Sequence, residues 1–170
     1  MKNEKITIYT DGSARGNPGK AGWGVVFISG DKVWEMGGRS EHATNNQMEL
    51  TAAIEALRHV KKSSGARGAT SKETTARNGA ENPTVEIFSD SKYVILGVTE
   101  WIHGWIKNGW RNAAKKPVLN RELWEELHEL NKEVKPKWSY VAGHADSVYN
   151  NRADEIATSY ADNLPMKLKT

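Results

Sequence analysis

The chain has 170 residues, of which 38% are hydrophobic, and this length suits a single domain built around one core. It contains no cysteine, which excludes disulfides, a thiolate nucleophile and a cysteine-bound zinc ion. The formal net charge of +3 is a mild basic excess, which by itself supports nucleic-acid binding only weakly.

Three strands are predicted at the start of the chain. Residues 6–10 alternate apolar and polar side chains and lead to Asp11. A glycine- and proline-rich loop follows at residues 16–19. Residues 22–28 and 33–38 are the next two strands, separated by a turn at residues 29–31. The short connections predict an antiparallel meander.

A helix is predicted to begin near Thr44, because Thr44 and Gln47 have the spacing of a capping box. Leu50, Ile54 and Leu57 follow at helical spacing. Glu49 lies one position away from this apolar stripe.

Residues 63–83 contain no aliphatic side chain larger than alanine. Such a segment cannot bury enough apolar surface to offset the entropy of ordering it. We therefore predict a flexible insertion at 63–83 within one domain that spans residues 1–170. Arginine and lysine side chains in the insertion are candidates for non-specific contacts with nucleic acid.

The second half of the chain alternates strands and helices. Residues 85–88 are predicted to form a strand that leads to Asp90, and residues 137–142 form another. Helices are predicted at residues 92–97, around 101–106 and from Asn120, which is expected to cap its helix. A last helix at 150–162 would turn three side chains inward, those of Ile156, Tyr160 and Leu164. Residues 165–170 are expected to form a tail.

Two acids have the same local setting, since Asp11 and Asp90 each follow a predicted strand. Sites in α/β proteins gather where strands end, so these acids would lie side by side if their strands are neighbours. Clustered carboxylates repel one another, and divalent cations with a preference for oxygen ligands, such as Mg²⁺, remove that repulsion. The alternative is that each aspartate belongs to a turn or caps a helix, and that Glu49 is an ordinary solvated helix residue.

Seven segments, in order, resemble type 1 ribonuclease H. They are residues 9–19 (YTDGSARGNPG), 44–50 (TNNQMEL), 88–94 (FSDSKYV), 101–105 (WIHGW), 116–120 (KPVLN), 141–145 (VAGHA) and 150–155 (NNRADE). The resemblance runs from Ile6 to about Leu164 and leaves out only residues 63–83. It implies an α/β fold with a mixed five-stranded sheet, three strands antiparallel and two parallel, flanked by helices.

The resemblance also implies an activity. The chain would be a metal-dependent endoribonuclease that cuts the RNA strand of RNA–DNA hybrids by a two-metal-ion mechanism, leaving 5′-phosphate and 3′-hydroxyl ends. Two Mg²⁺ ions, or Mn²⁺ in their place, would be held by Asp11, Glu49, Asp90 and Asp154. His144 would assist proton transfer or product departure, and its ordinary pKa suits that task at neutral pH. The alternative for His144 is a plain surface residue.

Contacts with the hybrid are predicted at amides, small residues and a basic, tryptophan-rich segment. Amides can donate to and accept from the ribose 2′-hydroxyl, which an A-like duplex displays in its minor groove, and cationic side chains contact phosphates. Within the basic segment, Trp101 and Trp105 are expected to belong partly to the core and Trp110 to be more exposed. The predicted contact residues are Gly12, Ser13, Asn17, Asn45, Asn46, Gln47, Ser91, Lys92, Trp101, Trp105, Lys107, Trp110 and Asn120.

Two positions depart from the family pattern. Lys92 stands where an amide is common, and residues 146–149 (DSVY) replace a Gly-His-Pro-Glu-like loop next to His144. Two other interpretations stay open: an integrase-like or junction-cutting nuclease on the same fold, and a hybrid-binding module without catalysis.

No apolar run reaches the roughly 18 residues of a membrane span, and residues 1–5 lack a signal peptide's apolar stretch. We therefore expect a cytoplasmic monomer whose partner is an RNA–DNA hybrid.

Overall fold

Five strands form one mixed sheet in the order β3-β2-β1-β4-β5. The computed structural model describes residues 4–68, 83–142 and 147–170. Strands β1 (Lys5–Arg15), β2 (Gly19–Ser29) and β3 (Lys32–Ala43) pair antiparallel. Strand β4 (Thr84–Ser89) pairs parallel with β1, and β5 (Lys137–Tyr140) pairs parallel with β4. The predicted division into three antiparallel and two parallel strands is therefore confirmed.

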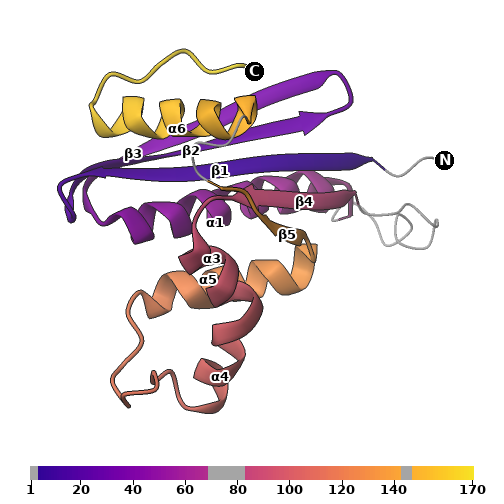
Figure 1. The fold of residues 1–170 in the computed structure, drawn as a ribbon. Helices are drawn as coiled ribbons and strands as arrows, with labels where there is room; N and C mark the ends of the chain where they lie inside the picture. Colours follow the sequence, from indigo (N-terminus) through magenta and orange to yellow (C-terminus); the bar gives the residue numbers. More distant parts are fainter. Residues whose placement is uncertain (1–3, 69–82, 143–146) are drawn as a thin grey trace.

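Helices cover both faces of the sheet (Figure 1). Helix α1 (Asn45–Gly68) and helix α5 (Arg121–Val134) lie on one face, together with α3 (Lys92–Leu96) and α4 (Ile102–Lys107). Of the described helices, only α6 (Val148–Ala161) lies on the other face. None of the described helices combines the length and apolar character needed to cross a membrane.

The core follows from the alternation of side chains along the central strands. Val25 and Phe27 of β2 pack against the α1 side, whereas Val26 packs with Ala153 and Ile156 of α6. All five are fully buried. Because successive strand residues point to opposite faces, one apolar run in β2 supplies buried side chains to the clusters on both sides of the sheet.

The β1–β2 pair extends further than the sequence predicted. Asp11 was expected to follow the first strand, but β1 continues to Arg15 and Asp11 lies within it. Parallel pairing with β4 ends at Thr10 and Ser89, while antiparallel pairing with β2 continues to Arg15 and Lys20. Beyond Thr10, the β4 edge of β1 is therefore left open for a site.

Several other boundaries also differ. Strand β3 continues to Ala43 because it pairs with the long β2, and β5 ends at Tyr140, two residues early. Helix α1 runs to Gly68, so the expected insertion at 63–83 begins inside a helix, and its residues 69–82 lie outside the described part of the chain. The helices predicted around 92–97 and 101–106 are joined by one π-helical turn, η1 (Gly97–Trp101).

The chain beyond α6 corrects one core prediction. Leu164 was expected to point inward, but it is exposed because α6 ends at Ala161 and Asn163 takes a positive φ of 59°. Met166 and Leu168 pack against the apolar cluster beneath α6 instead. At the other end, α6 begins at Val148, where the Ser147 side chain accepts a hydrogen bond from the Asn150 backbone N–H.

Candidate active site

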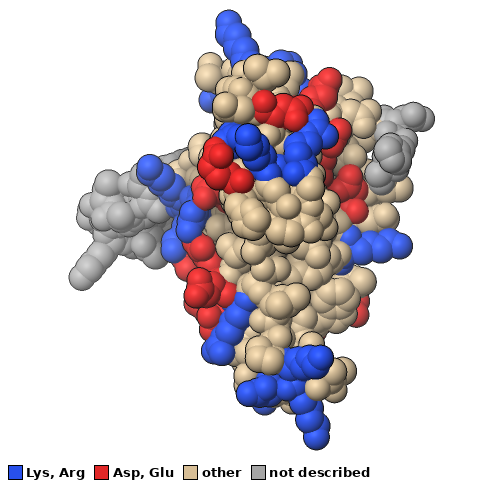
Figure 2. Space-filling model, turned by 90° about the vertical axis from the view of Figure 1, so that its left-hand side faces the viewer, with Lys and Arg blue, Asp and Glu red and all other residues tan. Residues whose placement is uncertain are grey.

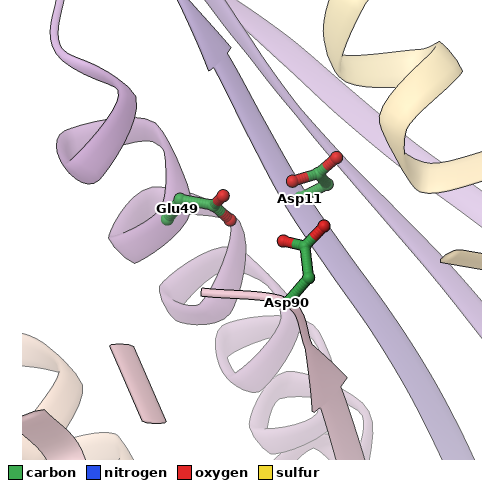
Figure 3. A group of neighbouring side chains, drawn as sticks. All are labelled: Asp11, Glu49 and Asp90. Carbon is green, nitrogen blue, oxygen red and sulfur yellow. The ribbon is translucent and has the colours of Figure 1, made fainter. Parts of the chain in front are cut away.

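Three carboxylates from separate elements meet at the open edge of β1. Asp11 comes from β1, Glu49 from the second turn of α1, and Asp90 directly follows β4. One oxygen of each carboxylate lies within 4.8 Å of the others. Figure 3 shows the three side chains pointing toward one another. The sequence prediction that Asp11 and Asp90 are neighbours is explained by the parallel β1–β4 pairing.

Gly12 allows helix α1 to approach β1 closely. A Cβ atom at Gly12 would lie 2.5 Å from the Glu49 backbone nitrogen, closer than real Cβ contacts. Only the absence of a side chain therefore lets Glu49 lie this near to Asp11. The capping box at the start of α1 is also confirmed. The Thr44 N–H donates to Gln47 Oε1 at 2.9 Å, and the Gln47 N–H donates to Thr44 Oγ1 at 3.1 Å.

The electrostatics of the cluster favour protonation. Burial, together with the neighbouring charge of Asp90, raises the pKa of Asp11 from 3.8 to about 8. Burial and the charges of Asp11 and Asp90 raise the pKa of Glu49 well above its ordinary value. The pKa of Asp90 is also raised, first by burial and then by Asp154, against the hydrogen bond from Asn150. Three acids that resist ionisation together call for a positive partner.

The donor set fits a hard divalent cation. Glu49 Oε1 is buried and has no hydrogen-bond partner among the described residues, so this oxygen could act as a ligand to a cation. The cluster offers only oxygen ligands, and Mg²⁺ binds through one or two carboxylates plus water and substrate phosphate. The same atoms would be costly to keep charged and buried without such an ion.

Asp154 lies near this cluster but not within it. It is exposed on α6, and its charge contributes to the raised pKa values of Asp11 and Asp90, behind burial in both cases. The described group of mutually close acids contains no fourth member. His144, the predicted proton-transfer residue, lies outside the described residues.

Two predicted contact amides join the β1–β2 turn to helix α1. The Asn45 N–H donates to Asn17 Oδ1 at 3.0 Å, and Asn45 Oδ1 accepts from the Ala14 N–H at 2.7 Å. Both asparagines are exposed, as is Asn46. Ser13 is half-buried in β1 opposite Gly22. The structure thus brings these amides together at the start of α1, the helix that also carries Glu49.

Asn120 occupies the N-cap position of α5, as predicted, but it does not cap the helix through its side chain. Its backbone is left-handed, with φ 61°, and the side chain makes no capping bond. Instead, Asn120 Oδ1 accepts from Gln47 Nε2 and Asn120 Nδ2 donates to the Tyr93 hydroxyl, both at 3.1 Å. The Trp124 indole N–H also donates to this hydroxyl at 3.1 Å. The amide therefore links α1, α3 and α5.

Tyr93 and Trp124 were missed as site-organising residues. Tyr93 stands in the family-like segment 88–94 but was assigned no role, and Trp124 is fully buried beside it. A tyrosine or tryptophan with a polar group in a core usually needs a partner for that group, which is the signal that could have identified both residues.

The exposure predicted for the tryptophans is wrong in part. Trp101 is 40% exposed, because Ile102 takes the inward position next to it. Trp110 is only half-exposed, since it packs on Trp105 and its ring is covered by the Arg121 guanidinium. Trp105 is held against Trp124 at a centroid distance of 5.2 Å, as expected for a partly buried anchor.

Cationic side chains gather at the end of α4 and on the segment that follows it. Lys107, Arg111, Lys115 and Lys116 are all exposed there. Figure 2 shows lysine and arginine side chains at the lower end of the molecule, where α4 lies in Figure 1. The basic segment predicted from the sequence therefore forms an exposed, positively charged surface.

Ser91 and Lys92 lie beside Asp90 at the start of α3. The Ser91 side chain accepts from the Val94 N–H at 3.2 Å and so caps this short helix. Lys92 is exposed, and its ammonium lies 5.4 Å from the centre of the Tyr140 ring. Lys92 thus follows Asp90 by two residues in the chain, and its ammonium lies over an aromatic ring of β5.

Comparison with known proteins agrees with this geometry. A family model described as RNase H matches residues 3–162. The chain is 47% identical over 152 residues to a ribonuclease H from Bradyrhizobium diazoefficiens, covering 89% of this chain and 86% of that protein. It is 44% identical to a ribonuclease H from Thermosynechococcus vestitus, covering 96% and 92% of the two chains.

Solved structures have the same fold. The crystal structure of LC11-RNase H1 in complex with an RNA/DNA hybrid is similar with a TM-score of 0.65 and 26% identity, covering 94% of this chain and 98% of that one. The crystal structure of LC9-RNase H1 has a TM-score of 0.75 at 23% identity, with coverage of 100% and 79%.

Proposed function

The chain belongs to the ribonuclease H family, and on this basis we propose that it is an endoribonuclease that hydrolyses the RNA strand of RNA–DNA hybrids. One observation carries the proposal: Asp11, Glu49 and Asp90 present carboxylate oxygens within 4.8 Å of one another at the open edge of β1. A relative at 26% identity was solved with an RNA/DNA hybrid, which supports the choice of substrate. The products would carry 5′-phosphate and 3′-hydroxyl ends.

Asp11, Glu49 and Asp90 would hold divalent cations, with Asp154 as a fourth acid. We propose two Mg²⁺ ions during catalysis, with Mn²⁺ able to replace them, because all the donors are hard oxygens. Such ions supply charge stabilisation at the phosphodiester and lower the pKa of water, so that a nucleophile exists at neutral pH. The chain's own contribution is to bury and fix the carboxylates. His144 would accept or deliver a proton near the leaving group.

The hybrid would be held along two surfaces. Asn17, Asn45 and Asn46 offer exposed amides beside Glu49, suited to the RNA 2′-hydroxyl and backbone. The cationic segment after α4 would contact phosphates of the DNA strand, so binding should weaken with salt. The further proposed contacts, from residues next to the acids or on the tryptophan-rich segment, are Gly12, Ser13, Gln47, Ser91, Lys92, Trp101, Trp105, Lys107, Trp110 and Asn120.

We also propose that the protein acts as a monomer in the cytoplasm. Every described member of the site comes from one chain, and the proposed substrate forms where DNA is present. Sedimentation at micromolar concentration and cell fractionation would test these two points separately from the activity.

The activity is tested with a hybrid whose RNA strand is fluorescent. With Mg²⁺, the wild-type chain should cut the RNA strand, and EDTA should stop the cutting. Asp11→Asn should abolish cleavage, whereas Asp31→Asn should leave it unchanged. The second variant makes the same charge change at the exposed turn after β2. Enzymatic labelling of the fragments would identify their ends.

Two results would contradict the proposal. Binding of the hybrid without cleavage would indicate a binding module. Equal cutting of double-stranded DNA would indicate a related nuclease with a different substrate.

A further inference from the structure

A buried ion pair anchors helix α6 to the edge strand β3. The Arg152 guanidinium donates to both oxygens of Glu35, from Nε to Oε2 at 2.7 Å and from Nη2 to Oε1 at 2.9 Å. The Glu35 side chain is only 1% exposed, and that of Arg152 is 24% exposed. This paired geometry fixes direction as well as distance, because two parallel hydrogen bonds define a plane.

The C-terminal segment of residues 167–169 closes over this pair. The Glu35 N–H donates to the Lys169 carbonyl, and the Lys169 N–H donates to Glu35 Oε1, both at 2.8 Å. Arg152 Nη2 also donates to the Lys167 carbonyl at 3.2 Å. Met166 and Leu168 secure the segment by packing against the apolar cluster beneath α6. The tail thus pairs with β3 at Glu35 and covers the carboxylate.

The satisfied hydrogen bonds keep Glu35 charged despite its burial. Burial raises the pKa of Glu35, but the hydrogen bonds from Arg152 and from the Lys169 N–H outweigh it and leave the pKa below its ordinary value. A buried pair of this kind contributes little net stability compared with apolar residues, yet removing one partner is costly. Its distinctive effect is therefore to hold α6 in one place.

Arg152 lies only two residues before Asp154 on the same helix. A shift or rotation of α6 that moved one would move the other. A second ion pair joins the C-cap residue of α6 to the sheet: Arg15 donates to Asp162 from Nε at 2.6 Å and from Nη2 at 2.7 Å. That pair is exposed and lies just past the other end of α6, eight residues beyond Asp154.

We propose that Glu35 and residues 167–169 form a positioning element that places Asp154 beside Asp11 and Asp90 by fixing Arg152. Glu35 touches neither substrate nor metal and acts only through the helix. The inference rests on the proposed function, since it assigns a task within that site.

The test compares Glu35→Gln with Asp162→Asn, which removes the ion pair at the other end of α6. Glu35→Gln should lower kcat roughly tenfold to a hundredfold, the range for residues that orient metal-site ligands, with KM for the hybrid changed less than about twofold. Asp162→Asn should keep kcat within about twofold. Deleting residues 167–170 gives a second variant, which exposes the pair while leaving Glu35 and Arg152 themselves in place, and should lower kcat in the same direction. The deletion also removes the charges of Lys167 and Lys169. It decides the question if Glu35→Gln does not fold.

A double variant separates positioning from general loosening. In an Asp154→Asn background, Glu35→Gln should lower kcat by less than about twofold, because the group that it positions is already absent. A full additional loss would show that Glu35 does not act through Asp154 and would overturn the inference.

Hydrogen exchange in the metal-free protein gives a readout that does not depend on activity. Glu35→Gln should speed exchange at amides 150–156, whereas Asp162→Asn should affect amides near 159–162. Unchanged exchange at 150–156 would overturn the inference even if the enzyme cuts hybrids. Failure of the wild-type chain to cut hybrids would overturn the proposed function instead, and the exchange result would be unaffected.

Discussion

Asp11 lies directly opposite Gly24 in the antiparallel pairing of β1 and β2. A Cβ atom at Gly24 would stand 2.5 Å from the carbonyl oxygen of Ala153 in α6. The missing side chain therefore lets α6, which carries Asp154, approach the sheet beside the first acid of the cluster.

Gly24→Ala should consequently disturb both stability and activity. The added methyl group must push α6 outward, and overpacking of this kind costs about 1 to 3 kcal/mol. Gly104→Ala is the matched control. A Cβ atom at Gly104, in α4, would have nothing within 4 Å of it, so alanine should stabilise the helix by about 0.5 to 1 kcal/mol. Urea unfolding and kcat on the hybrid would measure both, and equal stability of the two variants would contradict the prediction.

Asp11→Asn should stabilise the metal-free protein at neutral and alkaline pH. The folded pKa of Asp11 is raised from 3.8 to about 8, so the folded state binds a proton that the unfolded state has released. The stability linked to this proton is present below about pH 4 and is lost as pH rises through about 8. In the variant, stability should fall less steeply with rising pH, and the free energy of unfolding should be about 1 to 2 kcal/mol higher at pH 8 than in the wild-type chain.

The measurement is thermal unfolding in EDTA from pH 4 to pH 9, with Asp31→Asn as control. Glu49 and Asp90 also have raised pKa values and will keep some of the slope. Identical pH profiles for Asp11→Asn and the wild-type chain would count against the electrostatic account.

Divalent cations should stabilise the fold by binding only the assembled carboxylates. At a free Mg²⁺ concentration of about 100 times its Kd, linkage gives about 2.7 kcal/mol, or about 5 to 10 °C in Tm for a chain of this size. Asp90→Asn should reduce the shift strongly. A shift of equal size in that variant would mean that the cation binds elsewhere.

Two substitutions at Asn120 should separate its backbone role from its side-chain role. Asn120→Ala and Asn120→Gly both remove the bridge between Gln47 and Tyr93, so each should weaken hybrid binding roughly threefold to tenfold, the worth of one hydrogen bond. Glycine adopts the left-handed backbone of this position without steric cost, whereas alanine pays about 1 to 2 kcal/mol. Titrations at fixed salt and urea unfolding would test this, and equal stabilities would contradict it.

His144→Ala should lower kcat roughly a hundredfold, because general acid–base catalysis is worth at least that much, while affinity for the hybrid changes little. Single-turnover rates and binding titrations give the two quantities. Equal losses in both would indicate that His144 only positions the substrate.

The order of the elements and the identity of the acids follow from the amino-acid sequence alone. Alternating apolar residues marked the strands, and the Thr44–Gln47 spacing marked the start of α1, because both signals are local. Alternation follows from the two-residue period of side chains along a strand, and the capping box joins residues three positions apart. The resemblance, carried by segments such as residues 9–19, then selected Asp11, Glu49 and Asp90 from the 21 acidic residues of the chain.

Features that depend on partners distant in sequence emerged only in three dimensions. The continuation of β1 past Asp11 depends on pairing with β2, and the inward role of Asn120 depends on Gln47, which lies 73 positions earlier. The anchoring of Arg152 to Glu35 joins residues 117 positions apart. No local pattern encodes such contacts, because each becomes favourable only when packing brings the two elements together and removes water from their polar groups.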